Sequence, residues 1–205
     1  MLQFITHRTE KYSEVEGARL ALEGGCRWIQ LRAKEATEAE RYMMAMELLS
    51  LCRNYNAMLI IDDHVELTRD ACADGVHLGK RDMSIKEARR MLREGYVIGG
   101  TANSMEDIRQ LVGDGVDYIG LGPYRFTETK KGLSPVLGLE SYRTIMKQCE
   151  EEGISIPIVA IGGIEEEDVK QLMETGIAGV AVSGSILRAD NPVETTHRII
   201  KKLEK

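Results

Sequence analysis

Short apolar runs recur along the whole chain, and segments with a helical pattern follow nearly all of them. Eight runs have the length of a strand: LQFIT, RWIQL, AMLIID, GVHLG, YVIGG, DYIGLG, IPIVAIGG and GVAVSG. The intervening segments place apolar residues three or four positions apart, as in 13–23, 37–53, 104–113, 139–152 and 165–175. Glycines in LALEGG, LVGDG and METG mark the ends of several of these segments. The pattern predicts strands and helices in alternation.

The strands read as continuous apolar runs, which is typical of a parallel sheet covered on both faces. Eight strand–helix units predict an α/β fold, a single (β/α)8 TIM barrel in one domain that spans residues 1–205. An open, doubly wound sheet is the main alternative. The first strand is not followed by the GxGxxG turn of a dinucleotide-binding sheet, which disfavours that alternative.

Composition narrows the function. The 205 residues are 43% hydrophobic, enough for a full core, and the net charge of −6 argues against a nucleic-acid partner. The apolar start of MLQFITHRTEK is too short for a signal peptide or a membrane span. No CxxC pair occurs, which indicates reduced thiols and a cytoplasmic protein with no membrane partner; the cysteines are Cys26, Cys52, Cys72 and Cys149.

Polar side chains follow seven of the eight predicted strands. In a barrel these positions meet at one mouth, where the chemistry of the fold is carried. A single cation there is usually a solvated side chain, and a single aspartate is usually a helix cap, but recurrence at seven strand ends favours a common site. The positions are Gln30, Arg32, Lys34, Asp62, Asp63, His64, Lys80, Asp82, Thr101, Asn103, Thr127, Thr129, Lys130, Gly162, Gly163, Ser183, Gly184 and Ser185.

Charge predicts what this mouth binds. Arg32, Lys34 and Lys130 would converge there, which favours a bound anion. Asp63 and Asp82 beside them suit a Mg²⁺ ion held partly by substrate phosphates. The turns AIGGI and AVSGSI, at the last two strands, favour a second phosphate site on backbone N–H groups, although the glycines of AIGGI have close packing as an alternative role.

The motifs IQLRAK, LIIDDHVEL, ADGVHLGKRD, DYIGLGPYRFTETKKG, IPIVAIGGI and GVAVSGSI resemble, in order and spacing, those of the thiamine phosphate synthase family. The resemblance runs from about residue 30 to residue 186, and the TETK segment is its most specific part. It implies a (β/α)8 barrel that joins hydroxymethylpyrimidine pyrophosphate to thiazole phosphate. Pyrophosphate leaves with the help of Mg²⁺, a stabilised carbocation forms, and the thiazole nitrogen captures it.

Residue roles carry over by matching motif. The resemblance implies Asp63 and Asp82 as the magnesium ligands, and as the catalytic residues Arg32, Lys34, Thr101 and Lys130. The segment Gln30, Leu31, Arg32, Ala33 and Lys34, together with Asp62, Thr101 and Lys130, would hold the pyrimidine pyrophosphate. The thiazole phosphate site would comprise Thr127, Glu128, Thr129, Gly163, Ser183 and Gly184. Both partners are small molecules, and the sequence leaves open whether the chain forms a homo-oligomer.

The sequence departs from the family pattern at three places, and these departures leave related functions as alternatives. Asp62 stands where the family usually has Asn, and a carboxylate there repels phosphate unless it is protonated or binds metal. Ala33 replaces a usual acidic residue, and VSGSI shifts a hydroxyl by one position. A thiazole tautomerase-like relative and a non-catalytic thiamine-precursor-binding barrel are therefore alternatives. The tautomerase branch uses a histidine in the segment TANSMED, where this chain has Asn103, and tends to lose the magnesium aspartates, so the synthase is favoured.

Overall fold

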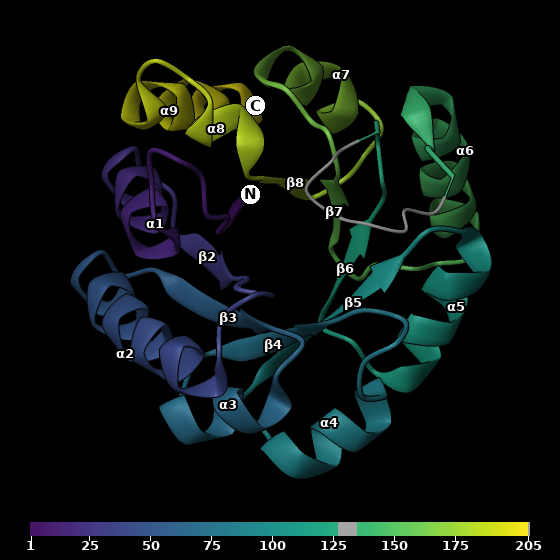
Figure 1. Cartoon of the computed structure of the whole chain (residues 1–205). Helices are drawn as coiled ribbons and strands as arrows, with labels where there is room; N and C mark the ends of the chain where they lie inside the picture. Colours follow the sequence, from purple (N-terminus) through teal and green to yellow (C-terminus); the bar gives the residue numbers. More distant parts are fainter. Residues whose placement is uncertain (127–134, 205) are drawn as a thin grey trace.

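The computed structural model describes residues 1–126 and 135–204. In these residues eight parallel strands pair in sequence order, and the first also pairs with the last, so that the sheet closes into a barrel (Figure 1). Closure places Leu2 opposite Val180. The predicted (β/α)8 barrel is confirmed, with β1 (Leu2–Ile5), β2 (Trp28–Leu31), β3 (Met58–Asp62), β4 (Gly75–Leu78), β5 (Val97–Ala102), β6 (Tyr118–Leu121), β7 (Ile158–Ile161) and β8 (Gly179–Val182).

Helices surround the barrel on its outside (Figure 1). They are α1 (Glu14–Glu23), α2 (Glu38–Asn54), α3 (Val65–Ala71), α4 (Ile85–Leu92), α5 (Met105–Asp114), α6 (Gly138–Glu151), α7 (Val169–Met173), α8 (Gly184–Leu187) and α9 (Pro192–Leu203). The expected bounds hold within about a residue for four of the five segments. The fifth, 165–175, was predicted too long: a 3-10 turn, η1 (Glu166–Asp168), precedes the five-residue α7.

Short polar motifs determine where several helices begin. Ser13, Thr37 and Ser104 each form a capping box, in which the hydroxyl accepts from the third helical N–H and an acidic side chain returns the bond. Such a cap stabilises a helix by about 1 kcal/mol. Because α1, α2 and α5 start at fixed residues, the loops that join them to the preceding strands have defined lengths, and these loops border the mouth.

The sheet separates two cores. Alternate strand residues such as Phe4 and Ile29 pack outward against the helices, in a large cluster of buried side chains. The others point into the barrel and form a small inner cluster of Ile5, Trp28, Ile60, Tyr118, Val159 and Ala181. Burial on both faces explains why the strands read as continuous apolar runs. Towards the mouth the inward positions become polar, beginning with Gln30 and Asp62.

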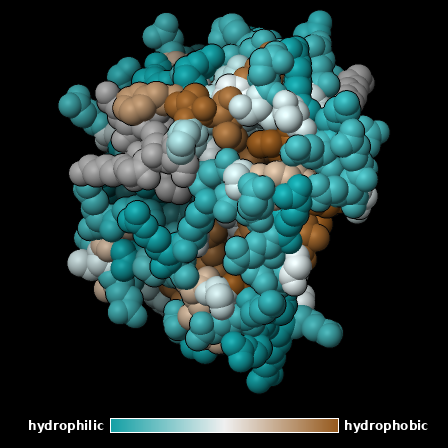
Figure 2. All heavy atoms as spheres, turned by 90° about the vertical axis from the view of Figure 1, so that its right-hand side faces the viewer, coloured by the Kyte–Doolittle hydropathy of each residue, from teal (hydrophilic) through white to brown (hydrophobic). Residues whose placement is uncertain are grey.

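The outer surface on the side of α5 and α6 is mainly hydrophilic (Figure 2). On the face that carries α5 and α6, apolar side chains gather in patches between hydrophilic ones (Figure 2). This is typical of helices that bury one side against a sheet. In the part of the chain that the structure describes, no helix has the length and apolar character needed to cross a membrane.

Candidate active site

Two consecutive aspartates lie at the end of β3 and point in different directions. Asp62 is the last inward-facing residue of the strand, nearly fully buried, and its Oδ1 accepts a hydrogen bond of 2.6 Å from Gln30 Nε2. Asp63 adopts a left-handed φ of 66°, a conformation that Asp tolerates better than most residues, and its N–H donates to the His77 carbonyl at 2.9 Å. The tight turn therefore brings both carboxylates to the mouth.

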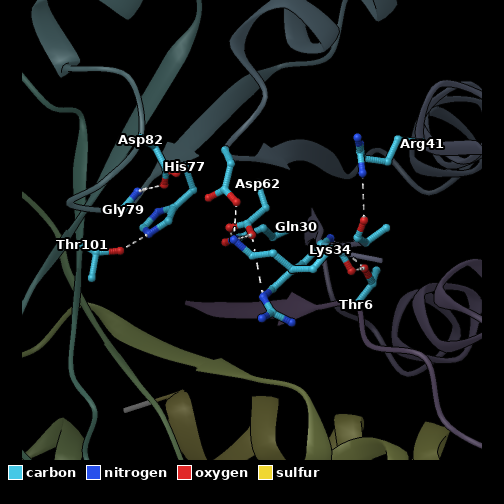
Figure 3. A network of polar contacts seen from close by, with 12 residues as sticks. Thr6, Gln30, Lys34, Arg41, Asp62, His77, Gly79, Asp82 and Thr101 are labelled. Carbon is cyan, nitrogen blue, oxygen red and sulfur yellow. Dashed lines mark hydrogen bonds and ion pairs between the residues drawn. The ribbon is translucent and has the colours of Figure 1, made fainter. Parts of the chain in front are cut away.

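Two cations from the end of β2 meet these carboxylates, and Figure 3 shows Lys34 beside Asp62. Lys34 Nζ contacts Asp63 and lies 3.8 Å from Asp62 Oδ2, and Arg32 Nε lies 3.7 Å from the same oxygen. The backbone of Arg32 is fixed by Thr6, whose hydroxyl accepts from the Arg32 N–H at 2.8 Å and donates to its carbonyl at 3.1 Å. The structure thus brings together Arg32, Lys34 and the aspartates, as predicted.

Asp82 completes the acidic group from the loop after β4. Its Oδ2 accepts a 2.7 Å hydrogen bond from the Gly79 N–H, and a Cβ on Gly79 would lie 2.9 Å from that oxygen, so glycine permits the close approach. Lys80, in the same loop, pairs instead with Asp107 at 2.6 Å. Of the two predicted site residues in this loop, Asp82 joins the site and Lys80 does not.

The charges of the site are tightly coupled. Burial and the neighbouring Asp63 raise the pKa of Asp62 to about 6. Burial alone would raise the pKa of Asp63, but its contacts with Lys34 and Asp82 outweigh burial and lower it. Burial and Asp63 together raise the pKa of Asp82. Three carboxylates and two nearby cations leave an excess of negative charge, which an added cation would relieve.

The donor set fits a magnesium ion shared with a substrate. Within residues 1–126 and 135–204, no group of three or more His, Cys, Asp or Glu side chains surrounds a common point. Mg²⁺ commonly takes one or two protein carboxylates, with water and substrate phosphates in the other positions. Asp63 and Asp82, two hard oxygen ligands side by side at an open mouth, suit that arrangement.

Thr101 borders the acidic group from β5. Its hydroxyl lies 2.9 Å from His77 Nε2, and its side chain is partly exposed at the mouth. Asn103, two residues further on, donates from Nδ2 to the Gly122 carbonyl and so ties the end of β5 to the end of β6. A hydroxyl that faces solvent beside cations and carboxylates can donate to a bound phosphate oxygen.

The turn after β7 is built from two glycines. Gly162 and Gly163 have φ values of 93° and 67°, and a Cβ on Gly163 would lie 2.9 Å from atoms of Arg125 and Phe126. The Arg125 N–H donates to the Gly162 carbonyl at 2.9 Å. Backbone conformation and close packing therefore already require glycine here. The helical segment expected after this turn begins as a 3-10 turn at Glu166, and the regular α-helix starts only at Val169.

The turn after β8 carries two hydroxyls that find no hydrogen-bond partner among the residues that the structure describes. Helix α8 begins at Gly184, directly after Ser183. The side-chain oxygens of Ser183 and Ser185 are buried and have no hydrogen-bond partner among the described residues. Because a buried hydroxyl is normally paired, this turn favours a ligand with acceptor oxygens.

Other predicted site residues differ in how they can contribute. Leu31 and Ala33 pack their side chains into the outer core, so that only their backbone can reach a ligand at the mouth. Thr127, Glu128, Thr129 and Lys130 lie outside the described residues, and their roles stay predictions.

The sequence reasoning missed a group of polar residues inside the barrel. Gln3, Trp28 and Tyr118 are buried and face inward, below the mouth. Gln3 could have been found, because it lies two residues before Ile5 in an otherwise apolar strand and so shares its inward face.

Comparison with known proteins gives a consistent result. The family model described as thiamine monophosphate synthase matches residues 2–186. A thiamine-phosphate synthase of Bacteroides fragilis is 59% identical over 199 residues, which cover 97% of this chain and 98% of the relative, and one of Flavobacterium psychrophilum is 46% identical over 98% of both chains. A solved thiamine phosphate pyrophosphorylase from Pyrococcus furiosus superposes with a TM-score of 0.87 at 36% identity, over 99% of this chain and 95% of the other.

Proposed function

The chain belongs to the thiamine monophosphate synthase family, and we propose that it joins hydroxymethylpyrimidine pyrophosphate to thiazole phosphate. The family assignment makes it a transferase of thiamine biosynthesis. The products would be thiamine phosphate and pyrophosphate. The observation that carries the proposal is the meeting of Arg32 and Lys34 with Asp62 and Asp63 at the mouth, beside Asp82.

The first substrate would bind on the β2–β5 side of the mouth. Lys34 and Arg32 lie where they can pair with its phosphates, and Thr101 can donate a hydrogen bond to them. Gln30 projects into the barrel beneath the charged group, where the pyrimidine ring would lie. In this arrangement cations and donors face the part of the substrate on which negative charge develops as pyrophosphate leaves.

Asp63 and Asp82 are the residues that would hold Mg²⁺. When bound there, the ion would offset the negative charge of the departing pyrophosphate. Asp62, buried and hydrogen-bonded to Gln30, would act mainly through that bond, and its pKa of about 6 leaves about half of it neutral near pH 6.

The second substrate would bind where β7 and β8 end. The hydroxyls of Ser183 and Ser185, which are unpaired within residues 1–126 and 135–204, and the N–H groups of the following turn are suited to a monophosphate. Gly163 shapes the neighbouring turn. The chain then has to orient the thiazole nitrogen and to exclude water, and neither task requires a protein nucleophile.

The direct test mixes the purified protein with both proposed substrates and Mg²⁺ and measures thiamine phosphate. We expect product that disappears when EDTA removes the metal and returns when Mg²⁺ is restored. Binding of both substrates without product would contradict the synthase and support a precursor-binding barrel. Conversion of a thiazole phosphate tautomer without any need for the pyrimidine would support a tautomerase.

A further inference from the structure

A chain of hydrogen bonds crosses the barrel interior and ends at Thr101. Gln3 Nε2 donates to the Tyr118 hydroxyl at 3.3 Å, that hydroxyl lies 3.0 Å from His77 Nδ1, and His77 Nε2 lies 2.9 Å from the Thr101 hydroxyl (Figure 3 shows the last link). These four residues come from β1, β6, β4 and β5, so that the chain of bonds joins half of the strands.

The donor and acceptor in each of these hydrogen bonds follow from which atoms carry a proton. Burial raises the pKa of Tyr118 far above its ordinary value, so the phenol keeps its proton. Gln3 already donates to that oxygen, and among the described residues His77 Nδ1 is the acceptor within reach of the proton. Nδ1 is therefore unprotonated, and neutral His77 carries its proton on Nε2, from which it donates to Thr101.

The hydrogen bond from His77 determines where the hydroxyl proton of Thr101 points. Its oxygen accepts from His77, so that its own proton points away from the ring, toward the mouth. We propose that His77, oriented by Tyr118, is a positioning residue that makes the Thr101 hydroxyl an obligatory donor to a phosphate oxygen of the pyrophosphate-bearing substrate. The inference rests on the proposed function, and it assigns His77 and Tyr118 a role beyond packing.

Neighbouring strands leave room for this arrangement. A Cβ on Gly99 would lie 2.2 Å from the Tyr118 ring, and a Cβ on Gly120 would lie 3.1 Å from His77 Cε1. Trp28 packs edge-on against Tyr118, with ring centroids 4.8 Å apart. The two glycines and the indole hold the rings of Tyr118 and His77 in position. The hydrogen bonds between these rings need fixed positions if each donor is to keep one acceptor.

The test is a double-mutant cycle of Thr101→Val and His77→Asn, with turnover and inorganic pyrophosphate binding in the presence of Mg²⁺ measured on all four proteins. Asn can reach the Tyr118 side but is too short to donate to Thr101. We expect each single change to lower kcat by about 10- to 100-fold, the range typical of a lost donor to developing charge, and the double variant to be no slower than Thr101→Val. Costs that multiply would overturn the proposal, because they would mean that His77 acts independently of Thr101.

A matched variant and a spectroscopic readout separate positioning from packing. In His77→Gln the amide nitrogen lies near the position of Nε2 and can donate to Thr101, so this variant should lose several-fold less activity than His77→Asn. Nitrogen NMR of labelled histidine should show His77 protonated at Nε2, and Tyr118→Phe should weaken that preference. A proton on Nδ1 in the wild type would overturn the proposal.

The outcomes also separate this inference from the proposed function. If the wild type binds pyrophosphate but forms no thiamine phosphate, the proposed function fails, and the cycle is then decided by pyrophosphate affinity. If the wild type does not bind pyrophosphate, both fail.

Discussion

The two sides of the barrel mouth are built from different materials. The side formed by β2 to β5 presents charged and polar side chains, namely Gln30, Arg32, Lys34, Asp62, Asp63, Asp82 and Thr101. The side formed by β7 and β8 presents glycines and two serines whose hydroxyls are unpaired among the described residues. One side therefore recognises charge with charge, and the other offers backbone N–H groups and hydroxyls.

The difference shows how one mouth can distinguish two phosphate-bearing molecules. A pyrophosphate with a metal carries concentrated charge that changes during the reaction, and preorganised cations and carboxylates suit it. A monophosphate that serves only as an anchor needs a rigid cradle with little net charge. The predictions below test this division, from the largest expected effect to the smallest.

Removal of charge on the β2–β5 side should have the largest effect. Asp63→Asn on that side, and Lys130→Ala in the segment that follows β6 in the sequence, should each lower kcat at least about 100-fold, because the departing pyrophosphate loses electrostatic stabilisation. The Asp63 variant should also require more Mg²⁺ for half-maximal rate. Steady-state rates across a Mg²⁺ titration measure this, with thermal unfolding as the control for folding. Rates within twofold of wild type in either variant would contradict the metal–pyrophosphate site.

A methyl group added on the β7 side should lower the stability of the fold and leave the charges of the site unchanged. Gly163→Ala should destabilise the protein by about 1–3 kcal/mol, since it combines a left-handed φ with a clash against Arg125 and Phe126. Gly184→Ala is the matched control, because the added Cβ there would meet the end of the flexible Arg188 side chain. Chemical denaturation of both variants measures the difference, and equal stabilities would contradict the packing argument.

Loss of a hydroxyl on the β8 side should affect binding alone. Ser183→Ala should raise KM for thiazole phosphate by about 10-fold, the typical effect of one lost hydrogen bond to a charged group, while KM for the pyrimidine stays the same. The melting temperature should not fall, because the substitution removes a buried hydroxyl that makes no hydrogen bond with the described part of the chain. A lower melting temperature with unchanged KM would mean that the hydroxyl is structural.

The smallest effect should come from Asp62→Asn. The pKa of Asp62 is about 6 in the folded protein, against about 3.9 in an unfolded chain, so between these values the folded state binds more protons and stability falls as pH rises. The variant loses this dependence. Without metal, it should be more stable than wild type by roughly 1–2 kcal/mol at pH 7 and similar at pH 4. Denaturation curves at both pH values measure the gap, and a wild type that is more stable at pH 7 would contradict the assignment.

Sequence patterns predicted the barrel because each strand is a continuous apolar run, and such runs have few alternatives in an α/β fold. They also predicted that Arg32, Lys34 and Asp63 would meet, since parallel strands end at one mouth. They could not separate Lys34 from Lys80, which both follow a strand. The difference depends on Asp107, which lies in the capping box of α5 and pairs with Lys80.

The chain of hydrogen bonds inside the barrel could not be predicted from the sequence for a related reason. His77 and Tyr118 are 41 residues apart, and their contact depends on the register of β4 to β6 and on the room left by Gly99. A pattern read along one strand predicts which side chains face inward. It does not predict which of them lie at the same height in the barrel, because height is set by the stagger between strands.

Closure of the ring between β1 and β8 has a consequence for synthesis on the ribosome. Leu2 finds its partner only when Val180 has been made, so most of the barrel has to wait as an open, curved sheet with two free edges. Once β7 has been made, these edges are β1 and β7, and each is a strand of only four residues, which offers little length for pairing with another nascent chain. The short strands that make the barrel compact would thus also protect it from aggregation during translation, until its last strand arrives.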